Sequence, residues 1–185
     1  HGVRERGMSI AGFTPRGIVY GGTWDGLRSS FGVRYATVIS APASALWPSA
    51  NLAIAVPYRL DDRITVRRLW LNNGTAVAGN VDIGIYDRSW NLLVSAGSTA
   101  QAGTGTLQYF DVTDTVIGPG LIYIAASCSD AATATAVRFA HPVASSRACG
   151  IVQMAAALAL PATFVPAIMA QVYVPHAGFT TRASP

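Results

Sequence analysis

The sequence predicts an all-β protein, namely an antiparallel two-sheet β-sandwich of the jelly-roll type with an irregular N-terminal arm. Apolar residues alternate with polar ones, as at Val81, Ile83 and Ile85. Gly, Pro, Asn or Asp interrupts such stretches about every 8 to 12 residues. No segment carries a convincing helical stripe, and 154–160 is the only helix candidate. Short alternating stretches between frequent turns are typical of antiparallel strands stacked in two layers.

The 185 residues suit one domain with a short additional segment. We assign 1–35 to a Gly- and Arg-rich arm and 36–185 to the β-sandwich domain. Lys is absent from the chain, and aromatic residues do not interleave with the arginines, which disfavours nucleic acid as a partner. We expect the arm to anchor the protein to a neighbouring surface through its arginines, which are Arg4, Arg6, Arg16, Arg28 and Arg34.

The first strands along the chain are predicted at 35–40, 51–60 and 63–71, with a proline-bearing loop at 41–50. Pro57 lacks a backbone N–H and indicates an edge position in the second of these strands. The adjacent Arg67 and Arg68 break the alternation of the third and indicate a bulge or an edge. Asn72-Asn73-Gly74 predicts a turn, because Asn and Gly tolerate positive φ.

Two hairpins are predicted next. The strand that contains Val81 to Ile85 turns at Asp87-Arg88-Ser89 and resumes at Leu92 and Val94. The strands 107–112 and 121–127 flank a turn at Gly118-Pro119-Gly120. Further strands are expected at 134–140, 151–157 and 167–174.

Residues 150–174 carry no charge, and this uncharged segment is long enough for a membrane helix. Pro161 and Pro166 would each remove a backbone donor in mid-span. We therefore expect two buried strands joined by a loop here, and no membrane span.

The composition favours assembly with other protein surfaces. Apolar residues make up 51% of the chain and charged residues 12%, against roughly 25% charged residues in ordinary soluble domains. Apolar surface that charge does not break up marks interaction sites. We expect a homo-oligomer, with a trimer favoured.

No catalytic centre is predicted. The acidic residues lie beside predicted turns, where Asp usually accepts backbone hydrogen bonds; paired carboxylates for glycoside hydrolysis are the alternative. The three histidines are too scattered for metal-ligand spacing, so we expect neither metal nor cofactor, and no enzyme. Cys128 and Cys149 are expected to be buried thiols, with a bridge between them left open. The acidic residues and histidines considered are Asp61, Asp62, Asp111, Asp114, Asp130, His1, His141 and His176.

Trp90 occupies an unusual position, because it lies in the hairpin turn DRSWN, where Gly or Asp is easier to accommodate. A Trp there either packs against protein or stacks on a sugar ring. In the second case Trp47 or Tyr86 would complete the stacking platform, and Asp87 and Asn91 would hydrogen-bond sugar hydroxyls.

Residues 47–175 resemble a recurring type of bacteriophage and prophage virion protein. The resemblance rests on NVDIGIYDRSWNLLVSAGST at 80–99, on 107–124, and on LPATFVP at 160–166. It implies a β-sandwich carried on the phage particle as a tail-fibre, receptor-binding or capsid-decorating component, with other virion proteins as partners. It implies no catalytic residues. This chain departs from the pattern at Trp90, where the pattern has Gly.

The function expected from the sequence is therefore that of a structural component of a phage virion, located on the particle and acting through oligomeric assembly, with a role in host-surface attachment. The alternative is a carbohydrate-binding module that recognises host surface glycans. The position on head or tail, the host receptor and the copy number are left open.

Overall fold

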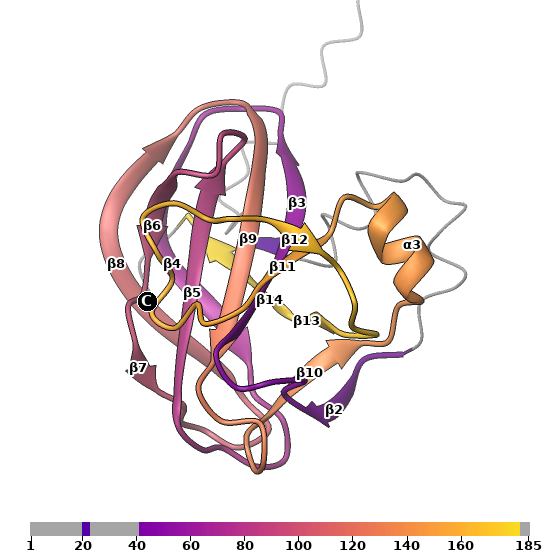
Figure 1. The fold of residues 1–185 in the computed structure, drawn as a ribbon. Coiled ribbons are helices and arrows are strands. Elements are labelled where there is room, and N and C mark those ends of the chain that lie inside the picture. Colours follow the sequence, from indigo (N-terminus) through magenta and orange to yellow (C-terminus); the bar gives the residue numbers. More distant parts are fainter. Residues whose placement is uncertain (1–19, 23–40, 182–185) are drawn as a thin grey trace, which may run out of the picture.

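A computed structural model describes residues 20–22 and 41–181. This part of the chain is built of β-strands in three sheets, and every strand pairing is antiparallel (Figure 1). The predicted all-β class is confirmed. The arm arginines and the predicted strand 35–40 lie outside the described residues.

The four-stranded sheet has the order β1-β14-β4-β8. Its long pair is β4 and β8, whose register shifts between Val66 and Arg68, as the two adjacent arginines predicted. The strand β1 comes from the segment assigned to the arm, and it pairs with β14. The strands are β1 (Tyr20–Gly22), β4 (Ile64–Asn72), β8 (Leu107–Ile117) and β14 (Ala177–Thr180).

The seven-stranded sheet has the order β12-β11-β3-β9-β5-β6, and β7 pairs with the start of β5. Pro57 of β3 lies opposite Tyr123 of β9, beyond the short stretch where β11 pairs on the other side. The strand β3 is therefore not an edge strand as expected, but Pro57 itself has a strand partner on the β9 side only. The strands are β3 (Leu52–Leu60), β5 (Asn80–Asp87), β6 (Leu92–Ser95), β7 (Thr99–Ala100), β9 (Gly120–Cys128), β11 (Val152–Met154) and β12 (Ala167–Ile168).

A three-stranded sheet and one short helix complete the described residues. The sheet has the order β13-β10-β2. Its strands are β2 (Ala43–Leu46), β10 (Thr135–Phe139) and β13 (Val174–Pro175), and the helix α3 (Val143–Ala148) follows β10. In Figure 1 the helix stands to the right, apart from the two larger sheets.

One continuous hydrophobic core joins the two larger sheets. On the seven-stranded sheet it takes the alternate residues of β5 and β3, such as Ile83, Ile85 and Ile54; on the four-stranded sheet it takes residues such as Leu69 and Phe179. Burying a side chain of this size contributes about 1.5–3 kcal/mol. The alternation read from the sequence is thus the inward face of each strand.

Four local expectations are wrong. The loop at 41–50 contains β2, whose backbone pairs with β10. Gly74 does not adopt positive φ; instead it lies so close to Ser44 and Thr135 that a Cβ would meet their side chains. The strand expected at 107–112 runs on to Ile117 as β8. The fourth is the helix, which lies at Val143–Ala148 and not at 154–160.

The C-terminal third also differs from the expected two strands. The interval 151–157 keeps only the short β11, and 167–174 holds β12 and the start of β13. Between β11 and β12 lie residues 155–166, which we name the strap. The strap contacts other parts of the chain through side chains and single backbone hydrogen bonds. Its apolar residues are therefore buried without forming a long strand. None of the helices in the described residues is long and apolar enough to cross a membrane.

Candidate functional site

The strap covers the outward face of the seven-stranded sheet. Ala157, Leu160 and Phe164 are buried and form a second apolar cluster with residues of β3, β5 and β9. The sheet face beneath them is lined by small residues, including Ala53, Ala55 and Ala125. Small side chains let the strap approach closely, so this sheet is buried on both faces. The approach is closest at Gly84, where a Cβ would lie 2.8 Å from Leu160 Cδ1.

A buried carboxylate fixes the centre of the strap. Asp82 of β5 is fully buried. One of its oxygens accepts the Leu160 N–H at 2.9 Å, and the other accepts the Ser95 hydroxyl at 2.7 Å. Burial raises the pKa of Asp82 above its ordinary value, although these hydrogen bonds act in the opposite direction. The sequence analysis missed Asp82, although an acidic residue inside a predicted strand was a usable signal.

The strap also joins the β5–β6 hairpin. Tyr86 donates its hydroxyl hydrogen to the Pro161 carbonyl at 2.8 Å. The Leu92 N–H bonds to the Ala162 carbonyl, and the Phe164 N–H bonds to the Trp90 carbonyl, both at 2.9 Å. Two of the segments that carry the sequence resemblance, 80–99 and 160–166, therefore lie against each other.

Trp90 is half-buried and packs against the second apolar cluster of the chain. Its ring stacks on Tyr123 at a centroid distance of 3.9 Å and on Phe164 at 5.4 Å. Its backbone has φ 69°, a left-handed conformation that side chains other than Gly seldom adopt. This explains in physical terms why a hairpin of this type favours Gly at that position. Here the packing of the ring offsets the strain of the backbone.

Asp87 and Asn91 hold the hairpin turn together. One Asp87 oxygen accepts the N–H groups of Ser89 and Asn91 at 2.8 and 2.9 Å, and the other accepts the Asn91 side-chain amide at 3.0 Å. The hydrogen bonds from Asn91 lower the pKa of Asp87 below its usual range. These groups are engaged in the turn, so they have fewer free positions for sugar hydroxyls.

The expected stacking platform needs a correction. Tyr86 is fully buried and Trp47 is 2% exposed. Trp47 packs edge-on against Tyr173 and donates its indole N–H to the Leu52 carbonyl at 2.9 Å. Neither ring offers a face to a ligand. Alternation along β5 turns Tyr86 under the strap, and Trp47, which directly follows β2, is buried in the main core. Of the five residues considered for sugar binding, the structure brings together Trp90, Tyr86, Asp87 and Asn91, but not as an open platform.

The remaining candidate residues take structural roles. Asp130 accepts three backbone N–H groups of the following turn, as expected. Cys128 and Cys149 are free and buried, and burial raises the pKa of Cys149 to about 11, which makes its thiol unreactive. His141 is buried, and its Nδ1 lies 2.8 Å from the Ser146 hydroxyl. Within the described ranges, no three His, Cys, Asp or Glu residues gather closely enough to hold a metal ion.

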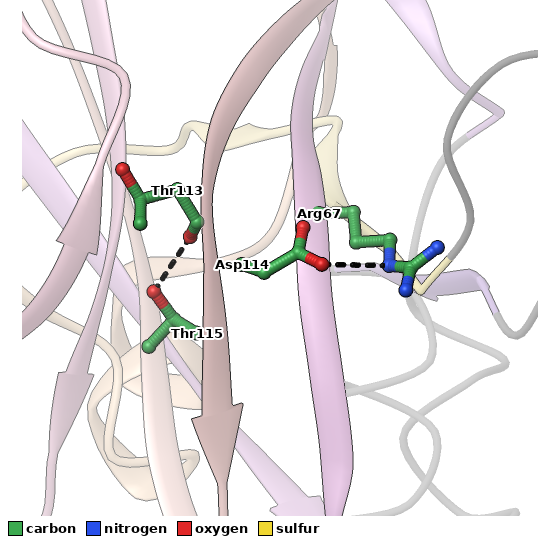
Figure 2. A network of polar contacts seen from close by, with 4 residues as sticks. All are labelled: Arg67, Thr113, Asp114 and Thr115. Atoms are coloured by element: carbon green, nitrogen blue, oxygen red, sulfur yellow. Dashed lines mark hydrogen bonds and ion pairs between the residues drawn. The ribbon is translucent and has the colours of Figure 1, made fainter.

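The outward face of the four-stranded sheet carries charge. Asp111 and Asp114 lie within β8 and not at a turn, and they pair with Arg68 at 2.5 Å and Arg67 at 3.2 Å. Arg68 also lies over the ring of Tyr109. Figure 2 shows Arg67 reaching across from β4 to Asp114 of β8. Asp114 was expected beside a turn, but β8 continues past it to Ile117. The extra residues of β8 at the register shift bring its side chain to this face.

Comparisons with protein-family models, with curated proteins and with solved structures gave no match. The functional conclusions therefore depend on the residues and their arrangement.

Proposed function

We propose that this chain is a structural component of a phage virion, a tail-fibre or capsid-decorating protein that acts through oligomeric assembly. In this proposal the two larger sheets form a jelly-roll-like sandwich, and three copies associate. The arginine-rich arm anchors the assembly to other virion proteins. The resemblance of 47–175 to phage virion proteins supports the location on the particle.

The observation that carries the assembly role is an uncharged apolar surface at the C-terminal part of the chain. Val165, Ile168 and Val172 are 66%, 72% and 50% exposed. All three lie within 150–174, which has no charged residue. Exposed apolar groups gathered in one uncharged segment are typical of a surface that another protein covers.

The edge of the seven-stranded sheet belongs to the same surface. Among the described residues, β12 has a strand partner on one side only, which is β11. Soluble proteins usually protect such an edge with charged side chains, and β12 has none. Beside it lies a hollow of about 270 Å³ lined by Arg147, Gly150, Ile151, Val152, Ile168 and Met169.

A stable interface needs more surface than these three side chains provide. Stable interfaces bury about 800 Å² on each partner, so in this proposal the edge of β12 and the hollow beside it are also part of the interface. A second copy that adds a strand to β12 and places apolar groups in the hollow would supply both. Burial then stabilises the assembly by about 25 cal/mol per Å² of apolar surface.

The test is the molar mass of the full-length protein in solution, measured by size-exclusion chromatography with light scattering. The wild type is expected to be an oligomer, and Ile168→Asp and Val165→Asp are expected to shift it to the monomer. Val116→Asp is the matched control, because Val116 is 61% exposed but lies on β8 of the other sheet. A monomeric wild type, or equal effects of all three variants, would reject the assembly role.

Location on the particle needs a separate measurement. Gold-labelled antibody against this chain should decorate intact phage particles in electron micrographs. If the protein is an oligomer but is absent from purified particles, the proposed assembly stands and the proposed location on the virion is rejected.

A further inference from the structure

We propose that the outward face of the four-stranded sheet binds an acidic glycan through a hollow at the start of β4. The hollow has a volume of about 410 Å³, within the rough range of 300–1,000 Å³ of small-molecule sites. This role goes beyond assembly and uses a different sheet from the one that contains β12. The residues that line the hollow are Arg63, Ile64, Thr65, Arg67 and Thr181.

The strand geometry gathers the polar groups of the hollow. Thr65 and Arg67 lie in β4, Arg63 directly precedes this strand, and all three line the hollow. Thr181 directly follows Thr180, which pairs with Arg68 in the neighbouring strand. Two arginines and two threonines therefore share one hollow, and none of the described residues that line it is acidic.

Asp114 positions one of the two guanidinium groups. Its Oδ2 lies 3.2 Å from the Nε of Arg67. In Figure 2 the two terminal nitrogens of Arg67 lie on the far side of the guanidinium group from Asp114, with no partner among the residues drawn. A guanidinium group held through Nε keeps its terminal donors for a planar anion such as a carboxylate.

Arg63 supplies the second positive charge. It forms no ion pair within the described ranges. Of the two acidic residues that directly precede Arg63, Asp61 pairs with the exposed Arg59, and Asp62 is exposed and is not among the described residues that line the hollow. The charged residues in this lining are the two arginines, so one positive charge is left after Asp114 is counted against Arg67.

Size and chemistry favour a glycan over a small inorganic anion. Arg63 and Arg67 are four residues apart, which separates their backbones by roughly 13 Å. A ligand with several anionic groups, or a long one, matches that separation better than a single small ion. Thr65 and Thr181 suit sugar hydroxyls. None of the described residues that line the hollow carries an aromatic ring on which nucleotide bases would stack.

The probe is a galacturonate oligosaccharide, and its methyl ester is the neutral control of the same size. Binding to the full chain is measured by calorimetry, together with the amide shifts of Thr65 and Thr181 in NMR spectra. We expect binding of the acid and not of the ester. Arg63→Gln and Arg67→Gln should each weaken it by about tenfold or more, since each removes a charge-assisted hydrogen bond. Arg88→Gln, on the exposed hairpin turn, should leave it unchanged.

Several results would overturn the proposal. They are absence of binding, equal binding of the methyl ester, or equal affinity in Arg63→Gln. Sulfate that binds as tightly as the oligosaccharide would reduce the hollow to a simple anion site. An oligothymidylate that binds more tightly through the same arginines would assign the hollow to nucleic acid. None of these results depends on the oligomeric state, so failure here is separate from failure of the assembly role.

Discussion

The outward faces of the two larger sheets differ in what covers them: one is buried under apolar residues of the chain, and the other carries exposed ion pairs. On the seven-stranded sheet, small residues lie under the apolar strap, which a buried carboxylate and Phe164 hold in place. On the four-stranded sheet, Arg67 and Arg68 pair with Asp114 and Asp111 at the surface. One face is closed by the chain itself and continues into an apolar edge, and the other meets water as paired charges. The comparison teaches that apolar burial and exposed charge are assigned to different sheets of this fold.

The largest effect is expected from shortening the anchor of the strap. Phe164 is 1% exposed, and Phe164→Ala should lower the free energy of unfolding by about 3–5 kcal/mol, because it removes a buried ring and leaves a cavity. Guanidinium denaturation measures the change. Val116→Ala, at an exposed position on β8, is the control and should change stability by at most about 0.5 kcal/mol. Equal effects would show that the strap is not part of the cooperative core.

The next effect concerns the buried carboxylate and depends on pH. Asp82→Asn should lower the free energy of unfolding by about 1–3 kcal/mol, because the buried N–H and O–H donors lose acceptors of the right kind. The folded pKa of Asp82 is raised. Stability from this group is therefore fully present below the unfolded pKa near 3.8 and declines as pH rises through the folded pKa.

The wild type should accordingly gain stability over Asp82→Asn as the solution is acidified from neutral pH towards pH 3.8. Urea denaturation of both proteins across this range gives the difference. A difference that is constant with pH, or that shrinks on acidification, would contradict the raised pKa.

Trp90 separates packing from backbone strain. Trp90→Ala and Trp90→Gly both remove the ring that stacks on Tyr123, but only Gly relieves the positive φ. The Gly variant should therefore be more stable than the Ala variant by about 1 kcal/mol, with both below the wild type. Thermal denaturation of the three proteins would show this order. If Ala were as stable as Gly, the left-handed backbone would not be the reason for the pattern at this turn.

The smallest effect is expected on the charged face. A double-mutant cycle of Arg68→Ala and Asp111→Ala should give a coupling energy of at most about 1 kcal/mol, because the Asp111 side chain is 79% exposed and solvent screens the pair. The coupling should fall further at high salt. A value of several kcal/mol would show that this face contributes to stability as much as the strap does.

Residues whose role follows from local patterns were predicted well. Alternation at Val81, Ile83 and Ile85 predicted β5, the paired arginines indicated the irregular pairing of β4 with β8, and Asp130 was correctly assigned to a turn. The strap was not predicted, because its role depends on contact with strands nearly a hundred residues earlier in the chain. Small residues on one face of β3 and an Asp inside β5 were the available signals for it.

The sequence by itself determined the all-β class, the positions of most long strands and the shortage of charge, because these follow from period-two alternation, turn residues and composition. Only the tertiary structure decided that Tyr86 is buried under the strap, that Trp90 packs against the same cluster, and that Asp82 is buried. It also decided that two arginines and two threonines share a hollow, which are Arg63, Arg67, Thr65 and Thr181. The physical reason is that burial and pairing are properties of surfaces brought together from distant parts of the chain. Alternation shows which residues share a face of a strand, but not what covers that face.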